Sequence, residues 1–266
     1  MSDQKSTVVI PCAGKGTRLY PLTKNLSKSL VKLGNYKMID YAISECILGN
    51  IDRIVFIIAP EDEQLKDHIS CINNKKMPGL KKNEYVDIDI KIIEQKKPLG
   101  LGNAIYLAKD HILDDSFGII LPDDLILDRN SSINKMKSIY LKYKINILFG
   151  KYISQDLIQS FGIIETGLRY ENLYLTVNKL LEKPNPKDTK SNLSILGRYY
   201  LNVKIFDYLH NLEPGHGGEI QLTDALSKML SEDKFIVVES ESNHFDVGNL
   251  KGLELAEIYL NNHPLL

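Results

Sequence analysis

The residues with the clearest capacity for chemistry form a glycine-rich segment near the N-terminus, Ala13-Gly14-Lys15-Gly16-Thr17-Arg18. Its glycines allow backbone N–H groups to turn toward one point, and Lys15 and Arg18 bring positive charge to the same point. This predicts an anion-binding loop, and a further cation follows at Lys28. A Walker A loop needs Ser or Thr after Gly-Lys, and a dinucleotide-binding fingerprint needs a third glycine where Leu19 stands, so neither is favoured.

A carboxylate that could bind a metal ion follows a buried run. Residues 117–121 are apolar and lead into Pro122-Asp123-Asp124. Open α/β sheets bind ligands outside the carboxyl ends of their strands, and a hard oxygen there suits Mg²⁺ carried by a nucleotide. From spacing alone, Asp123 could equally be a turn or helix-capping residue.

The strands that must position these residues are predicted to be buried on both faces of a sheet. Apolar runs at 7–10, 53–59 and 117–121 are accompanied by a helical pattern at 38–47, which Gly49 ends. Long apolar strands alternating with helices indicate parallel β-α-β units.

The second half of the chain changes character. Strands predicted at 161–165, 173–181 and 195–201 are joined by polar turns without intervening helices. We therefore expect an α/β fold in which an antiparallel region is added to a central, mostly parallel sheet flanked by helices. Further helices are predicted at 65–72, 104–112, 132–143, around Phe206 and at 251–261, and further strands at 86–95, 146–152 and 235–239.

Composition limits the classes of partner. The chain has 266 residues, 43% of them hydrophobic, and 33 Lys and Arg against 34 Asp and Glu. This near-neutral balance argues against nucleic acid or an anionic membrane as the main partner. Three cysteines (Cys12, Cys46 and Cys71) lack C-x-x-C spacing, so neither a disulfide framework nor a zinc site is indicated. With no signal segment or apolar stretch of about 20 residues, a cytoplasmic location is expected.

The stretch from Val8 to Leu30 resembles the N-terminal signature of the sugar-1-phosphate nucleotidyltransferases, in which an apolar strand precedes A-G-x-G-T-R-L-x-P-x-T and a later lysine. The resemblance implies a Rossmann-like nucleotidyltransferase fold and Mg²⁺ as cofactor. It assigns Arg18 and the loop amides to the triphosphate and Lys28 to the transferring phosphoryl group. Asp123, in an L-P-D segment, and Asp246, in a D-x-G-N segment, become the metal ligands, both expected at the ends of strands in one sheet.

The same resemblance implies which residues bind the base and which bind the sugar. Gln95 and Gly100 stand where the family reads the Watson-Crick edge of a pyrimidine, and a side-chain amide can match the O4/N3–H edge of uracil. In the second half, Gly162, Glu182 and Ile195 lie in segments that line the sugar pocket, and Lys183 would hold the sugar phosphate. The segment 192–198 as a whole resembles a pocket-lining stretch that ends in Gly-Arg.

Residues 215–225 indicate which members of this family the chain resembles most. They resemble the G-x-x-x-E-I-Q-L-T-D-A segment of the bacterial UTP:glucose-1-phosphate uridylyltransferases, although Gly218 stands where that family often has Asp. UTP and glucose 1-phosphate are then the implied substrates. Two alternatives remain: thymidylyl transfer to a sugar 1-phosphate, and a non-catalytic regulator that binds nucleotide sugars. Loss of Lys28 or of a metal aspartate would indicate the regulator, and neither is lost.

The expected organisation is one nucleotidyltransferase domain over 1–266, with a nucleotide-binding part at about 1–130 and a sugar-binding part at about 131–266. We also expect a homo-oligomer, a dimer or a tetramer. The lysine-rich segment 73–83 is interpreted as a solvated surface loop rather than a phosphate-attracting lid. His216 is interpreted as a loop residue rather than a catalytic base.

Overall fold

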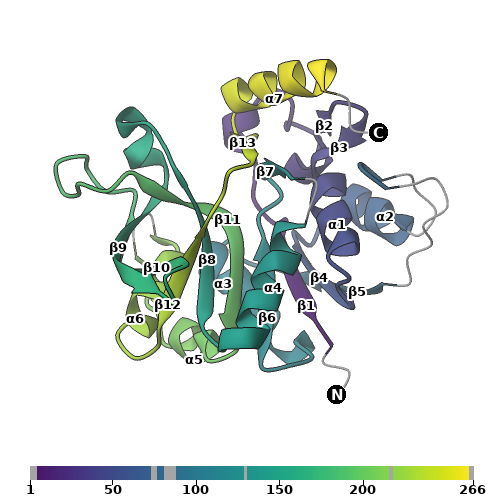
Figure 1. The fold of residues 1–266 in the computed structure, drawn as a ribbon. Coiled ribbons are helices and arrows are strands. Elements are labelled where there is room, and N and C mark those ends of the chain that lie inside the picture. Colours follow the sequence, from purple (N-terminus) through teal and green to yellow (C-terminus); the bar gives the residue numbers. More distant parts are fainter. Residues whose placement is uncertain (1–4, 73–76, 81–87, 129–130, 216–217, 264–266) are drawn as a thin grey trace.

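The computed structural model describes residues 5–72, 77–80, 88–128, 131–215 and 218–263 (Figure 1). Within these ranges the central sheet has the strand order β5-β4-β1-β6-β11-β8-β12-β10-β9. Its strands are β1 (Thr7–Pro11), β4 (Arg53–Ile58), β5 (Asp89–Glu94), β6 (Ser116–Ile120), β8 (Asn146–Tyr152), β9 (Gly162–Tyr170), β10 (Tyr174–Glu182), β11 (Leu193–Asn202) and β12 (Phe235–Glu239).

The first half of the sheet is parallel, as predicted. β1 lies between β4 and β6, and Val8 is in register with Ile54 on one side and Gly118 on the other. β5 extends the sheet in parallel beyond β4. Strands β1, β4 and β6 are buried on both faces, which explains their continuous apolar sequences, whereas the edge strand β5 is partly exposed.

The second half continues the same sheet with mixed pairing. β11 runs antiparallel to β6 and to β8, and β12 runs parallel to β8. β10 and β9 then close the sheet as an antiparallel pair. The expected antiparallel region is thus a direct extension of the parallel half through the β6–β11 pairing.

Helices cover both faces of the sheet (Figure 1). One face packs against α1 (Met38–Leu48), α2 (Glu63–Ser70) and α4 (Ser132–Tyr143). The other packs against α3 (Leu101–Tyr106), α5 (Ile205–His210) and α6 (Leu222–Met229). None of the helices among the described residues has the length and apolar character needed to cross a membrane.

Local signals explain where the longer helices begin and end. In α1 the Asp40 carboxylate accepts from the Lys37 N–H at 2.8 Å, and the helix ends before Gly49. Asp62 caps α2 by accepting from the Leu65 N–H, and Ser131 caps α4 by accepting from the Asn134 N–H.

A smaller layer lies beside one end of the sheet. It contains two short antiparallel pairs, β2 (Lys32–Leu33) with β3 (Tyr36–Lys37) and β7 (Asp124–Leu127) with β13 (Asn243–Asp246). The helix α7 (Leu250–Asn262) packs over them (Figure 1). Leu19 and Val247 are fully buried here, so the anion loop and the C-terminal segment share this core.

Several elements differ from the sequence predictions. The predicted helix 104–112 is divided into α3 and a separate 3-10 turn at Lys109–His111. A 3-10 helix, Gln155–Ser160, lies between β8 and β9, where no element was predicted, and α6, β7 and β13 were not predicted either. Most of the lysine-rich segment 73–83, Val86 and His216 lie outside the described residues.

Candidate active site

A cavity of about 520 Å³ opens at the carboxyl ends of β1, β5 and β6. Ten of the residues predicted to bind the nucleotide or its metal line it: Ala13, Gly14, Lys15, Gly16, Thr17, Arg18, Lys28, Gln95, Gly100 and Asp123. Asp246 joins them through Arg18, whose guanidinium lies 3.6 Å from the Asp246 carboxylate. The nucleotide half of the predicted site is therefore assembled in one place.

The anion loop leaves the sheet directly after Pro11, as predicted. Gly16 has a left-handed φ of 64°, and a Cβ there would lie 2.9 Å from the Lys28 Cβ, so only glycine fits. Thr23 donates its hydroxyl to the Gly16 carbonyl at 2.7 Å. The loop is thus packed against the segment that carries Lys28, and both cationic segments face one cavity.

Asp123 and Asp246 converge, although not in the expected way. Arg18 contacts both carboxylates, at 3.8 Å and 3.6 Å, and Lys28 pairs directly with Asp123. The expectation that both aspartates end strands of one sheet is wrong. Asp123 follows β6 of the central sheet, whereas Asp246 is the last residue of β13, which pairs with β7 instead.

Gly248 explains how the two carboxylates come close. A Cβ at this position would lie 2.7 Å from an Asp123 oxygen and 3.0 Å from an Asp246 oxygen. The chain is held there because the Val247 N–H donates to the Asp123 carbonyl at 2.9 Å. The D-x-G-N segment thus provides one carboxylate and leaves space beside it for the other.

This donor set fits a magnesium ion that arrives with a nucleotide. The Asp123 and Asp246 side chains are 24% and 26% exposed, so both remain accessible to solvent, and Asp123 lines the cavity. Among the described residues no cluster of three or more His, Cys, Asp or Glu side chains could hold a metal ion unaided. Mg²⁺ is commonly held by one or two carboxylates, with substrate phosphates and water completing its shell.

The residue next to Asp123 has a structural role. The Asp124 carboxylate pairs with His244 of β13 and accepts the Gly197 N–H. Burial alone would raise the Asp124 pKa, but His244, Arg198 and the Gly197 N–H together hold that pKa below its usual value. Asp124 therefore ties the Asp123 turn to β13 and to β11.

Arg198 departs from its expected place in a pocket-lining stretch. Its side chain is buried, and its guanidinium donates to the backbone carbonyls of Leu121 and Asp124, at 3.2 Å and 3.0 Å. The same guanidinium pairs with the buried Glu45 of α1 at 2.8 Å. Arg198 thus fixes the backbone before and after Asp123.

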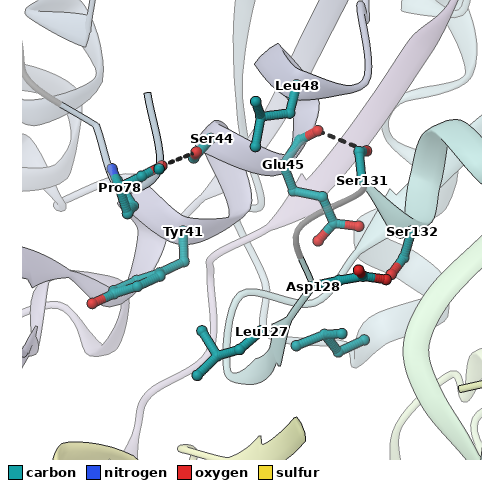
Figure 2. A pocket seen from close by; sticks show the side chains of 11 residues that line it. Tyr41, Ser44, Glu45, Leu48, Pro78, Leu127, Asp128, Ser131 and Ser132 are labelled. Carbon is teal, nitrogen blue, oxygen red and sulfur yellow. Dashed lines mark hydrogen bonds between the residues drawn. The ribbon is translucent and has the colours of Figure 1, made fainter. Parts of the chain in front are cut away.

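A second, smaller pocket of about 70 Å³, which Glu45 also lines, lies between α1 and the start of α4 (Figure 2). The Ser44 hydroxyl donates to the Pro78 carbonyl there, and the Ser131 hydroxyl donates to the Glu45 carbonyl at 2.9 Å. None of the predicted site residues lines it.

The predicted base-reading residues are in contact with each other. Gln95 follows β5, and its amide nitrogen donates to the Gly100 carbonyl at 3.1 Å and to the Asn103 side chain at 2.9 Å. Both amide N–H groups are therefore engaged within the protein, so the expected match of donor and acceptor to the O4/N3–H edge is reduced to the Gln95 oxygen as acceptor. Ile220 clamps this loop, because its N–H donates to the Leu99 carbonyl and its carbonyl accepts the Gly102 N–H, both at 2.8 Å. The E-I-Q-L-T-D-A segment thus supports the base-reading loop.

The predicted sugar residues form a group of their own. A Cβ on Gly162 would lie 3.1 Å from Ile195 and 3.6 Å from Glu182. The Thr223 hydroxyl donates to the Glu182 carboxylate at 2.7 Å, so the same E-I-Q-L-T-D-A segment also supports this group. Gly162, Glu182, Lys183 and Ile195 do not line the 520 Å³ cavity itself.

Lys183 is adjacent to this group. Its backbone has a left-handed φ of 44°, and its half-exposed ammonium lies 3.3 Å from the Glu182 carboxylate. The structure brings it to Glu182 but shows no contact with Lys28 or Asp123 among the described residues.

Several residues of the site were not predicted from the sequence. Asn103 and Thr223 act through contacts with distant segments, which no local pattern reveals, and Cys12 and Glu219 line the cavity. Cys12 follows the first strand directly, which is the one local signal that could have identified it. Burial raises the pKa of the Cys12 thiol to about 12, so it is not a thiolate nucleophile at neutral pH.

Comparison with known proteins places this geometry among related enzymes. Residues 7–262 match the family model described as nucleotidyl transferase. The UTP--glucose-1-phosphate uridylyltransferase of Mycoplasma genitalium is 32% identical over 97% of this chain and 92% of its own length. The protein of the same name from Pseudomonas aeruginosa is 30% identical over 92% of this chain and 91% of its own length.

Solved structures show the same relationship. A UDP-glucose pyrophosphorylase crystallised with UDP-glucose superposes with a TM-score of 0.86 at 26% identity, covering 97% of this chain and 99% of that one. A UTP-bound UGPase from Acinetobacter baumannii gives a TM-score of 0.81 at 25% identity, covering 98% and 96%.

Proposed function

The chain belongs to the nucleotidyl transferase family, and from this premise we propose that it transfers the uridylyl group of UTP to glucose 1-phosphate, giving UDP-glucose and pyrophosphate. The observation that carries the proposal is the single cavity that joins the anion loop, Lys28, Asp123 and the Gln95–Gly100 pair. The names of the similar enzymes and structures support the choice of UTP and glucose.

The reaction needs no covalent intermediate. A phosphate oxygen of glucose 1-phosphate forms a bond to the α-phosphorus of UTP, while the bond from that phosphorus to the bridging oxygen breaks and its electron pair leaves with pyrophosphate. The nucleophile is already an anion at neutral pH, so no side-chain base is required. The protonated Cys12 thiol in the cavity wall is consistent with this direct displacement.

The protein must hold UTP and glucose 1-phosphate, both anions, with the attacking and leaving oxygens in line. The backbone N–H groups of the anion loop and Arg18 would bind the triphosphate, and Lys28 would stabilise the transferring phosphoryl group. Lys183 would hold the sugar phosphate, and Glu182 would accept from sugar hydroxyls, with Gly162 and Ile195 shaping the pocket around them. Preorganised cations of this kind stabilise charge in the transition state without reorganising.

We propose Asp123 and Asp246 as the protein ligands of Mg²⁺. Their convergence around Gly248 and their partial exposure support this assignment. When bound, the ion would neutralise phosphate charge and orient the leaving pyrophosphate. The Arg18 and Lys28 cations beside them would balance the two carboxylates when the ion is absent.

The alternatives have less support. Thymidylyl transfer is named by a structural neighbour at 24% identity, which shows the fold alone. A non-catalytic regulator should have lost Lys28 or a metal aspartate, but Lys28 and Asp123 are both present and form an ion pair.

The homo-oligomer and the cytoplasmic location stay predictions. Leu255 and Ile258 are half-exposed on α7 and offer an apolar surface for self-association.

The deciding experiment follows pyrophosphate release from the pure protein with glucose 1-phosphate and each nucleoside triphosphate. UTP should give the highest kcat/KM, and dTTP should follow within roughly 10- to 200-fold, because one methyl group decides only about 1–3 kcal/mol. CTP should be rejected strongly, since it reverses the donor and acceptor at the paired edge. A value for dTTP above that for UTP would move the protein to thymidylyl transfer.

A further inference from the structure

The Gln95 amide is held in one of its two orientations. The residue is only 7% exposed, and its side-chain nitrogen donates one N–H to the Gly100 carbonyl and the other to the Asn103 side-chain oxygen. A backbone carbonyl can only accept, so the nitrogen end of the amide must face Gly100. The Gln95 side-chain oxygen is therefore the end left for a ligand in the cavity.

Asn103 supplies the second acceptor from the first turn of α3. Without it, one N–H of a buried amide would have no partner, which is costly inside a protein. With it, reversing the Gln95 amide would place an oxygen against the Gly100 carbonyl and would keep the bond to Asn103 only if the Asn103 amide turned as well. The two acceptors together stabilise the observed orientation.

Tight packing holds the backbone around Gly100 in place, so the Gly100 carbonyl cannot move away from the Gln95 amide. Gly100 has a φ of 96°, and a Cβ there would lie 2.8 Å from both the Glu219 Cβ and the Ile220 carbonyl oxygen. The two backbone hydrogen bonds of Ile220 fix the loop on either side of Gly100. The Gly100 carbonyl therefore stays in place for the Gln95 amide.

We propose that Asn103 is a positioning residue that sets which base this cavity accepts, by holding the Gln95 oxygen toward the base. The proposal rests on the proposed function in that it takes the Gln95–Gly100 loop as the base-reading element. An oxygen in this place accepts from a ring nitrogen that carries a proton, as N3 does in uracil and thymine. In cytosine the same nitrogen carries a lone pair, which the Gln95 oxygen would oppose.

The test measures equilibrium binding of UTP and of CTP without any sugar phosphate, so that no transfer is needed. Asn103→Leu removes the acceptor at similar size, and Asn103→Asp keeps it. We expect Asn103→Leu to lower the ratio of UTP to CTP affinity by about 2- to 10-fold, the effect of one net neutral hydrogen bond, and Asn103→Asp to retain the ratio. Asn103→Ala serves as a second acceptor-free variant should Asn103→Leu unfold.

A double-mutant cycle separates this role from a general structural one. If Asn103 acts through Gln95, Asn103→Leu should change the ratio no further in a Gln95→Ala background. An unchanged ratio in folded Asn103→Leu, or an equal fall in the Gln95→Ala background, would overturn the proposal. So would wild-type protein that binds UTP and CTP equally. Retained discrimination without pyrophosphate release would instead count against the transfer activity alone.

Discussion

Lys28 and Asp123 form an ion pair across 95 positions of sequence, at the wall of the cavity. The two residues were assigned to different tasks, the cation to a phosphoryl group and the carboxylate to Mg²⁺. In the structure each neutralises the other, and both side chains are mostly buried, at 17% and 24% exposure. Binding of metal and nucleotide would therefore exchange one set of charge contacts for another, without leaving an unpaired charge in the wall.

Replacing Lys28 tests its part in catalysis. Lys28→Ala should lower kcat by roughly 10²-fold or more, because it removes one preorganised electrostatic contact with the transferring group. Lys24→Ala, an exposed lysine of the same segment, should leave kcat unchanged. Initial rates of pyrophosphate release check both variants, with circular dichroism as the test of folding. Near-normal kcat in a folded Lys28→Ala protein would show that Lys28 does not stabilise the transferring group.

The metal assignment gives a second prediction. Asp246→Asn should raise the Mg²⁺ concentration needed for half-maximal activity sharply, since an amide oxygen is a weaker ligand than a carboxylate. Asp123→Asn should do the same. Mg²⁺ titrations of the initial rate at fixed UTP would show it, with the exposed Asp110→Asn as the matched change of charge. If neither variant shifts the midpoint, these carboxylates are not the ligands.

Local signals predicted the conformation of the anion loop. The strand before the anion loop is buried on both faces, and Gly16 has the left-handed φ that its place in the loop requires, so sequence and structure agree there. Asp246 was placed on the wrong sheet because the four-residue β13 pairs with β7, more than a hundred positions earlier, and such short pairings leave no periodic pattern.

Residues that act through distant partners were also beyond the sequence. Thr223 meets Glu182 across 41 positions, and Arg198 meets Glu45 across 153. Both lie in segments recognised by resemblance, yet only the packing of β10, β11 and α6 shows what their side chains contact.

The contact between Thr223 and Glu182 predicts an effect limited to the sugar. Thr223→Val should lower kcat/KM for glucose 1-phosphate by roughly 10- to 100-fold, because a hydrogen bond to a charged group contributes about 1.5–3 kcal/mol. The KM for UTP should change little. Thr223→Ser keeps the hydroxyl and should restore most of the loss. Equal changes in both KM values would point to a general disturbance of α6 instead.

The cysteines should react very unequally with a thiol reagent. Burial raises the pKa of Cys12 to about 12 and raises that of Cys46 as well, whereas Cys71 is exposed. At pH 8, a pKa near 12 leaves roughly 10³-fold less thiolate than an ordinary thiol would have. Native protein should therefore show one fast equivalent with Ellman's reagent, and three in urea. Three fast equivalents in folded protein would contradict the buried position of Cys12.

Asp124 predicts a particular loss of stability in acid. Burial alone would raise its pKa, but His244, Arg198 and the Gly197 N–H hold the pKa below the usual 3.8. A carboxyl whose pKa is lower in the folded state contributes stability that is present above its unfolded pKa and is lost as the pH falls through the folded pKa. Asp124→Asn should therefore unfold more easily at pH 7, by about 1.5–3 kcal/mol, and its free energy of unfolding should fall less steeply than that of the wild type below about pH 4.

Urea unfolding at pH 7, 5, 4 and 3 would measure both effects on Asp124→Asn. Asp110→Asn, at an exposed position outside the Asp124–His244 contact, should follow the wild-type curve throughout. The two variants separate a specific buried carboxylate from a simple change of net charge, because both remove one negative charge. If Asp124→Asn and wild-type protein lose stability in parallel between pH 4 and pH 3, then Asp124 does not contribute to acid unfolding, and the Asp123 turn is joined to β13 through backbone contacts alone: the β7–β13 pairing and the hydrogen bond from the Val247 N–H to the Asp123 carbonyl.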